Sequence, residues 1–342
     1  MSFAVNPVLG REIKERFRSR RAPIFVTLWV LGVGLIGYLV YLVAQLAARS
    51  AFGLGQGVAG GYMGRFIFEG MMALLMTGVI MIVPGLTALS IVGERERQTF
   101  HLLQVTQLSP LQIVLGKLWS SMSYFLLLVV AVAPVAAVPL LFGGVRLGDV
   151  LAGLGMLILT ALMLGSIGIW GSARARSSRG AVANAYAWSF VIGFITFALM
   201  GAELLFVNNQ SGPFPPRGRE VVSILPNPYV GMVSAVVAPL GSDGLQGTPF
   251  DPIEALLLSR QGFDEVFFGQ GGPVPGGVDP SLIDPSGRLA ANQALPLRRP
   301  PVWLFTLAIY LLITTLAIWG ATRRVRAPAA RIRSVRSRNG NP

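Results

Sequence analysis

Apolar residues fall in long blocks along this chain, and polar residues gather between the blocks. A helix that crosses a bilayer needs about 20 mostly apolar residues, and six blocks meet this requirement. Glu69 and Glu203 lie near block ends and are the acidic exceptions in these blocks. The pattern predicts an all-α polytopic membrane protein with six transmembrane helices. The blocks run roughly over residues 23–48, 66–92, 118–142, 150–170, 181–207 and 302–321.

Composition supports the membrane class. The chain of 342 residues is 53% hydrophobic and only 13% charged, whereas soluble domains carry about 25% charged residues. It holds no cysteine and one histidine, which excludes disulfides, thiolate metal sites and multi-histidine metal sites. The net charge of +13 would suit a nucleic-acid partner. We expect no nucleic acid, because the basic residues lie beside the apolar blocks and so report membrane topology.

Nineteen of the 28 lysines and arginines fall in four segments on one side of the predicted membrane. These segments are the stretch before the first block, the second-to-third and fourth-to-fifth connections, and the basic tail 322–342. Cytoplasmic segments carry the excess of Lys and Arg. The distribution therefore predicts a multi-pass protein of the cell (inner or plasma) membrane with both termini in the cytoplasm.

One long connection, residues 208–301, is predicted to be an external loop between the fifth and sixth helices. It holds fifteen of the 23 prolines. Its apolar stretch 221–240 is nearly long enough to span, but Pro226 and Pro228 interrupt it. We expect residues 229–240 to form a re-entrant or a surface helix on the outer face, since a seventh span would export the basic tail. The role of the loop stays open.

The segment 1–22 has the pattern of an amphipathic helix. Leu9, Ile13 and Phe17 recur every fourth residue on one face, and basic residues occupy another. Such a helix suits the surface of an anionic cytoplasmic leaflet. The alternative is a positive flank that serves only to orient the first span.

The second-to-third connection carries the most informative pattern. Charged residues end the second block from Gly93 onward, and a short helix is expected over residues 99–106. Ser109 and Pro110 then form an N-cap and first-turn pair that restarts a helix into the third span. A short helix held between two spans at the cytoplasmic face is suited to relay force from a soluble partner.

Two stretches of this region, residues 84–99 and 108–117, resemble the permease subunits of ABC transporters of the ABC-2 type. In that family a "GERERGT" stretch and an "LSP…GK" stretch flank a coupling helix, and here Gln98 stands where glycine is usual. Residues 6–12 resemble the N-terminal interface helix of the family, and the last span, which ends in Thr322-Arg323-Arg324, is similar to its final helix. The resemblance covers most of the chain except residues 208–301.

The resemblance implies a subunit that pairs with a second permease, identical or related, and docks two ABC ATP-binding subunits that hold ATP and Mg²⁺. Closure of those subunits would pass through the coupling helix to a substrate path between the permeases, most often for export. We expect Glu94 and Glu96 at the rim of this ATPase-coupling interface and Thr99, Phe100 and Leu103 in it. For the two glutamates, a solvated helix end is the alternative.

ATP binding is not expected in this chain itself. A P-loop needs G-x-x-x-x-G-K-[ST], and its best remnant, Gly116-Lys117, is followed by Leu118 and has Leu111 at the first glycine position. The sequence therefore predicts a transporter subunit without catalytic residues, metal or cofactor of its own.

Two other functional classes are alternatives for a chain of this kind. A membrane-embedded enzyme needs clustered nucleophiles, acids or bases inside the spans, and a secondary transporter usually shows repeats and ionisable residues near the midplane. Neither pattern is clear here. Glu69 and Glu203 are candidates for a substrate path, because an ionisable group in a span is costly unless paired or wet. Their alternative place is the outer headgroup zone.

Small residues and prolines suggest how the spans pack. Gly32, Gly34 and Gly37, or Gly165 and Gly168, would allow two helices to approach closely. Kinks are expected at three prolines, Pro84, Pro134 and Pro139.

Overall fold

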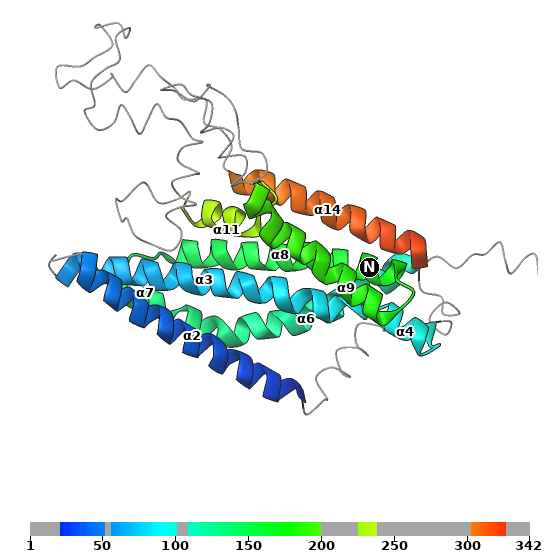
Figure 1. Ribbon diagram of the computed structural model, residues 1–342, viewed down its shortest axis with the longest axis horizontal. Helices are drawn as coiled ribbons and strands as arrows, with labels where there is room; N and C mark the ends of the chain where they lie inside the picture. The colour runs from blue at the N-terminus through cyan, green and yellow to red at the C-terminus, as the bar shows by residue number, and fades with distance from the viewer. Residues whose placement is uncertain (1–20, 52–55, 101–108, 200–224, 238–301, 326–342) are drawn as a thin grey trace, which may run out of the picture.

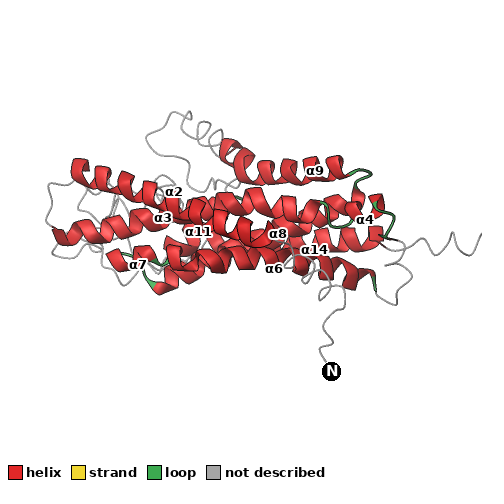
Figure 2. Cartoon of the chain, turned by 90° about the horizontal axis from the view of Figure 1, so that it is seen from below, coloured by secondary structure: helices red, strands yellow, loops and turns green. Residues whose placement is uncertain are grey.

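The computed structural model describes residues 21–51, 56–100, 109–199, 225–237 and 302–325, and all regular structure in these ranges is helical. Long helices run side by side along the molecule, with the short helices α4 at one end and α7 at the other (Figures 1 and 2). In chain order they are α2 (Arg21–Ala51), α3 (Gln56–Ala88), α4 (Val92–Glu96), α6 (Pro110–Ala136), α7 (Val138–Phe142), α8 (Leu147–Arg174), α9 (Ser178–Phe190), the π-helix η1 (Val191–Ile195), α11 (Pro228–Val237) and α14 (Val302–Val325).

Six helical segments of the described chain are long and apolar enough to cross a membrane, which confirms the predicted fold. The third segment begins at Pro110, about two turns before the predicted start at residue 118. The predicted connection between the second and third blocks, residues 93–117, is therefore too long, because Lys117 at its end lies inside a helix. The segments are Pro23–Leu46, Met63–Glu96, Pro110–Phe142, Leu147–Arg174, Ser178–Leu199 and Val302–Val325.

The early start of α6 has a local cause. The Ser109 hydroxyl accepts a hydrogen bond from the Gln112 backbone N–H at 3.3 Å, and the Gln112 side-chain oxygen accepts one from the Ser109 N–H at 2.8 Å. Pro110 follows in the first turn. This capping box satisfies two N–H groups at the start of the helix, so the predicted restart at Ser109 is confirmed.

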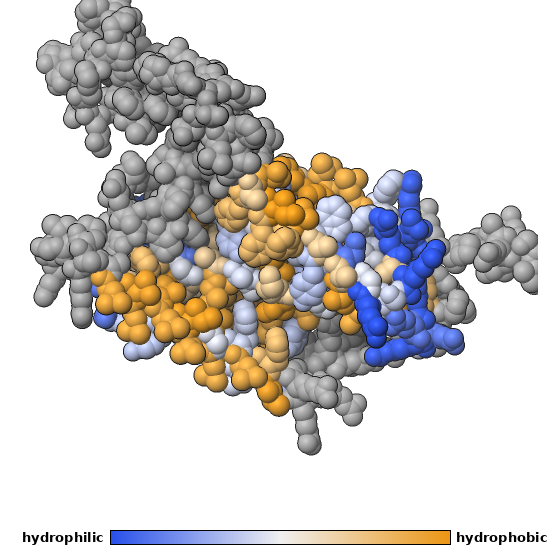
Figure 3. Space-filling view, viewed as in Figure 1, coloured by the Kyte–Doolittle hydropathy of each residue, from blue (hydrophilic) through white to orange (hydrophobic). Residues whose placement is uncertain are grey.

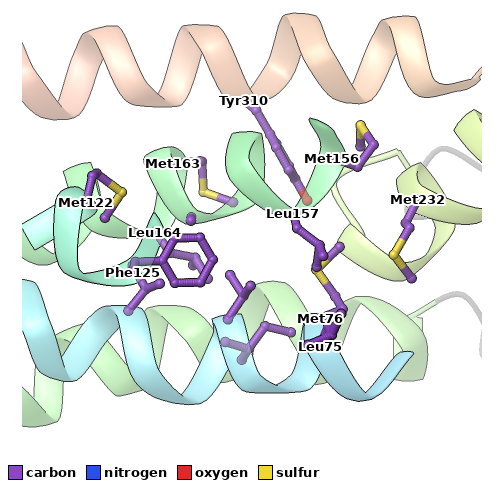
Figure 4. Close-up of a cluster of buried hydrophobic side chains, with 14 of the residues drawn as sticks. Leu75, Met76, Met122, Phe125, Met156, Leu157, Met163, Leu164, Met232 and Tyr310 are labelled. Carbon is purple, nitrogen blue, oxygen red and sulfur yellow. The ribbon is translucent and has the colours of Figure 1, made fainter. Parts of the chain in front are cut away.

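The core is centred on α3 and α8. In the most apolar stretch of each span, 56% of the residues are buried for α3 and 61% for α8, against 11% for α2. Helix α2 therefore lies at the periphery. Methionines occupy much of the space between helices, and Met76, Met122 and Met163 are among the buried side chains in Figure 4. Their unbranched thioethers fill irregular gaps between helices that cross at different angles.

Two glycines of α8 let neighbouring helices approach closely, α3 at Gly168 and α6 at Gly165. A Cβ at Gly168 would lie 2.0 Å from the Thr87 hydroxyl oxygen, and one at Gly165 would lie 2.9 Å from the Met122 methyl. The predicted close packing is thus confirmed for this pair. Gly32 and Gly34 have nothing within 4 Å of their Cβ positions, so they bring no other part of the described chain close.

The prolines interrupt the spans to different extents. Pro84 lies inside α3, which continues to Ala88. Pro134 lies in the last turn of α6, and Pro139 in the first turn of α7. The third span is therefore divided into α6 and α7, which agrees with a helix interrupted near Pro134.

Helix α11 is buried inside the bundle against α8, α14 and α3. The side chains of Val230, Met232, Val233 and Val236 are fully buried. The surface-helix alternative is therefore wrong, because such a helix would expose one face to water. The re-entrant alternative stays a prediction.

Asn227 fixes the start of α11. Its side-chain oxygen accepts hydrogen bonds from the N–H groups of Tyr229 at 2.9 Å and Val230 at 3.3 Å. Its amide nitrogen donates to the Thr196 hydroxyl at 2.7 Å, just after the π-helix η1. One side chain thus caps α11 and ties it to the fifth span.

Several predicted segments lie outside the described residues. They are the N-terminal interface helix with Leu9, Ile13 and Phe17, most of the coupling helix including Leu103, residue Glu203, most of the loop 208–301, and the tail beyond residue 325.

Candidate functional site

Helix α4 lies at one end of the bundle, where α3, α8 and α14 end and α6 and α9 begin (Figure 1). It has five residues, too few to be stable alone, so its contacts with other helices hold it in place. We call residues 91–96 together with Lys117, Ser172, Ala173 and Ser178 the α4 junction.

The start of α4 is capped from α8. The Ser172 hydroxyl oxygen accepts hydrogen bonds from the backbone N–H groups of Ile91 and Val92, each at 3.0 Å. Ser172 is fully buried. The first N–H groups of a helix lack partners within the helix, and here a side chain from a distant segment supplies the acceptor. This contact joins the end of the second span to the end of the fourth.

An ion pair joins α4 to α6. The Lys117 Nζ lies 2.7 Å from the Glu94 Oε1. Lys117 is 2% exposed, and the Glu94 side chain is 27% exposed. Taking a charge out of water is costly unless a partner compensates it, and Glu94 compensates the charge of Lys117. The second Glu94 oxygen, Oε2, is buried without a hydrogen-bond partner among the described residues.

Arg95 binds the end of α8. Its Nη1 donates to the Ala173 carbonyl at 2.9 Å, and its guanidinium lies 5.2 Å from the centroid of the Phe100 ring. A cation is favourable at a helix C-terminus, where carbonyls lack partners. The aromatic face adds a cation–π attraction.

Glu96 binds the start of α9. Its Oε1 accepts a hydrogen bond from the Ser178 backbone N–H at 2.6 Å, and its Oε2 accepts one from the Ser178 hydroxyl. A carboxylate is favourable at a helix N-terminus because of the exposed N–H groups there. Both oxygens of this predicted rim residue are therefore used within the chain.

The end of α4 requires a backbone angle at Gln98 that suits glycine, the residue that the resemblance implies at this position. Gln98 has a φ of 59°, in the left-handed region that favours glycine. Its N–H donates to the Arg95 carbonyl at 3.1 Å, and the Thr99 N–H donates to the Glu94 carbonyl at 3.0 Å. These two bonds form a Schellman motif, which reverses the chain at the end of α4.

The structure describes only the first two residues of the predicted coupling helix. Thr99 is exposed. Phe100 is 5% exposed and belongs to the buried core, so its ring has little surface left for a partner. The assignment of residues 99–106 to an ATPase-coupling interface stays a prediction.

Glu69 lies apart from the α4 junction, in the half of α3 that begins at the opposite end of the bundle. It is fully buried and forms an ion pair with Arg65 one turn earlier. This pairing meets the requirement for an ionisable group inside a span. Its place in a substrate path stays a prediction.

The sequence interpretation missed four members of the junction: Lys117, Ser172, Ala173 and Ser178. One signal was available for Lys117. The Ser109-Pro110 start places Lys117 two turns inside a helix, where a buried cation needs an acidic partner, and the preceding connection offers two acids, Glu94 and Glu96. No local signal marks Ser172, because any serine in a span can bond its own helix.

The fold and the junction define an α-helical integral membrane protein whose short end helix is tied to three spans. The sequence profile described as ABC-2 family transporter protein matches residues 61–321. The chain therefore belongs to the ABC-2 family of ABC transporters and is a membrane permease. The match begins after α2 and covers the next four spans and most of the last. No curated protein shows significant similarity to the chain.

Proposed function

We propose that this chain is the permease subunit of an ATP-driven exporter, and that its α4 junction passes movement of separate ATP-binding subunits to the spans. Two such subunits would bind ATP and Mg²⁺ and dock at the α4 end. A second permease, identical or related, would complete the substrate path.

The observation that carries the proposal is the number of spans that α4 contacts. An ion pair joins α4 to α6 through Lys117, and hydrogen bonds join it to α8 through Ser172 and Ala173 and to α9 through Ser178. It is also continuous with α3. A displacement of α4 would therefore move the ends of four spans together. The predicted coupling helix follows directly in the chain, so force applied there reaches α4 first.

Charge supports a cytoplasmic position for this end. Hydrophilic surface gathers at the α4 end in Figure 3. Arg97, Arg174, Arg176, Arg323 and Arg324 are exposed near the helix ends there. An excess of arginine favours the cytoplasmic side, which is where soluble ATP-binding subunits are found. Export is the direction that we propose by analogy with other members of the family.

The proposal is tested by photocrosslinking. The chain has no cysteine, so Thr99→Cys provides a single attachment point for a benzophenone maleimide. The labelled permease is isolated in complex with the P-loop ATPase that co-purifies with it and irradiated. We expect an adduct with the ATPase from position 99, because this exposed residue opens the proposed coupling helix.

The matched control is Leu141→Cys. Leu141 is 86% exposed and lies on α7, at the opposite end of the bundle. This label should give no ATPase adduct. No adduct at position 99 in an active complex, or equal adducts at both positions, would contradict docking at the α4 end. A secondary transporter or a membrane enzyme would give no adduct at either position.

A further inference from the structure

The ends of α8 and α14 carry the same five-residue pattern, W-G-x-x-R. It reads Trp170-Gly171-Ser172-Ala173-Arg174 in α8 and Trp319-Gly320-Ala321-Thr322-Arg323 in α14. Both helices end at the α4 end of the bundle, where they lie side by side (Figure 1). A Cβ at Gly320 would lie 2.6 Å from the Trp170 indole nitrogen. The two patterns are therefore in direct contact.

In each pattern the arginine stacks on the tryptophan one turn earlier. The guanidinium carbon of Arg174 lies 4.7 Å from the Trp170 ring centroid, and that of Arg323 lies 3.6 Å from the Trp319 ring centroid. Both arginines are exposed. Stacking on a ring orients a guanidinium and leaves its N–H groups free to bind an anion.

These arginines have no acidic partner in the described chain. The ion pairs among the described residues are Arg65–Glu69, toward the opposite end of the bundle, and Lys117–Glu94. The other glutamate of the α4 junction, Glu96, is bound to Ser178. Arg324 adds further positive charge beside Arg323. The paired helix ends therefore present positive charge that nothing in the described part of the chain neutralises.

An apolar stripe leads along α14 to Arg323. Leu312, Leu316 and Trp319 are 59%, 56% and 54% exposed, and their spacing of three to four residues places them on one helix face with Arg323. This stripe is apolar through the span and ends in a tryptophan and an arginine. A phospholipid has the complementary arrangement, with acyl chains in the hydrocarbon layer and a headgroup at the membrane surface.

We propose that the adjoining ends of α8 and α14 form a binding site for the headgroup of an acidic phospholipid. Arg174 and Arg323 would bind the phosphate oxygens, because a planar guanidinium offers two parallel N–H groups to a phosphate. The acyl chains would lie along Leu312 and Leu316. Basic sites between transmembrane helices are suited to anionic headgroups.

The proposal is tested with the full chain purified in a neutral detergent. Native mass spectrometry measures retention of dioleoyl phosphatidylglycerol against dioleoyl phosphatidylcholine. Wild type should retain the acidic lipid preferentially. An arginine near a membrane surface contributes about fivefold to the binding of anionic lipid. The double variant Arg174→Gln/Arg323→Gln should therefore lose roughly 25-fold of this preference, because the two contributions multiply.

The matched control is Arg176→Gln/Arg179→Gln. It removes the same charge at the same end of the bundle, from two exposed arginines that stack on no tryptophan in the described chain. It should keep most of the preference. Arg174→Lys/Arg323→Lys keeps the charge without the planar N–H pair and should fall between wild type and the glutamine variant, which distinguishes loss of binding from loss of folding.

Three outcomes would overturn the proposal. The first is a wild type without preference for the acidic lipid. The second is an equal loss in the control, which would mean that diffuse charge binds the lipid. The third is a site variant that keeps the lipid and loses the ATP-binding subunit, which would assign this surface to a protein partner.

Discussion

Gln98 shows how one backbone angle shapes the end of α4. Its φ of 59° is adopted readily by glycine, whereas in other residues the Cβ crowds the following carbonyl. The Schellman bonds of Gln98 and Thr99 depend on this angle. The chain therefore keeps a strained residue directly before the predicted coupling helix.

We expect Gln98→Gly to stabilise the chain. Relief of the left-handed strain is worth about 1–2 kcal/mol, and the greater freedom of glycine in the unfolded state offsets part of it. The net gain should be about 1 kcal/mol, seen as a higher midpoint of thermal unfolding in detergent. Gln98→Val should lower the midpoint, because a β-branched residue fits this region worse. A lower midpoint for Gln98→Gly would show that the angle is not strained.

Among the elements, α4 and α6 depend on one another through Glu94 and Lys117. The two residues are far apart in the sequence, and the pair forms only when the restart at Ser109 sets the rotation of α6. Because Lys117 is buried, its charge has no alternative contact with water. The pair therefore specifies one relative position of the two helices.

We expect Lys117→Met to destabilise the chain strongly, because it leaves Glu94 without its partner. Breaking a buried ion pair costs roughly 3–5 kcal/mol, and the partial exposure of Glu94 favours the lower end of this range. Lys117→Met/Glu94→Gln should recover part of the loss. The measurement is a double-variant cycle of thermal unfolding in detergent.

The control for this cycle is Arg97→Gln, an exposed neighbour with no ion pair in the described chain. It should leave the midpoint unchanged. If the double variant loses as much stability as Lys117→Met and Glu94→Gln lose together, Glu94 and Lys117 do not interact.

For the whole molecule, the two ends of the bundle differ in charge, and from this difference the excess of arginine on cytoplasmic segments predicts the orientation. Hydrophilic surface gathers at the α4 end (Figure 3), where α3, α8 and α14 end, and exposed arginines lie near the helix ends there. The loop 208–301 connects the fifth and sixth spans, which places it on the side opposite to the chain termini if six spans cross the membrane.

Cysteine labelling tests this topology. Ser334→Cys lies in the basic tail, and Gly271→Cys lies in the predicted external loop. A membrane-impermeant maleimide added to right-side-out vesicles should label Gly271→Cys alone, since the tail is predicted to be cytoplasmic. The tail position should react after the vesicles are made permeable. Labelling of Ser334→Cys in sealed vesicles would contradict the orientation and the predicted docking of ATPases at the α4 end.

The sequence by itself determined the six spans and the start of α6. Both depend on local physical chemistry. A long apolar stretch in lipid must form its backbone hydrogen bonds within itself and so becomes a helix. Ser109, Pro110 and Gln112 cap the helix that they begin. The resemblance around residues 93–117 also identified the correct family, because these motifs are continuous in the chain.

Only the tertiary structure decided how the α4 junction is assembled. The contacts of Ser172 with Ile91 and Val92, and of Glu96 with Ser178, join segments about 80 residues apart. The burial of Phe100 and of α11 likewise depends on which helices surround them. Apolar periodicity shows that a face is buried in lipid or in protein, but it does not distinguish the two. The packing of helices against one another supplies that distinction.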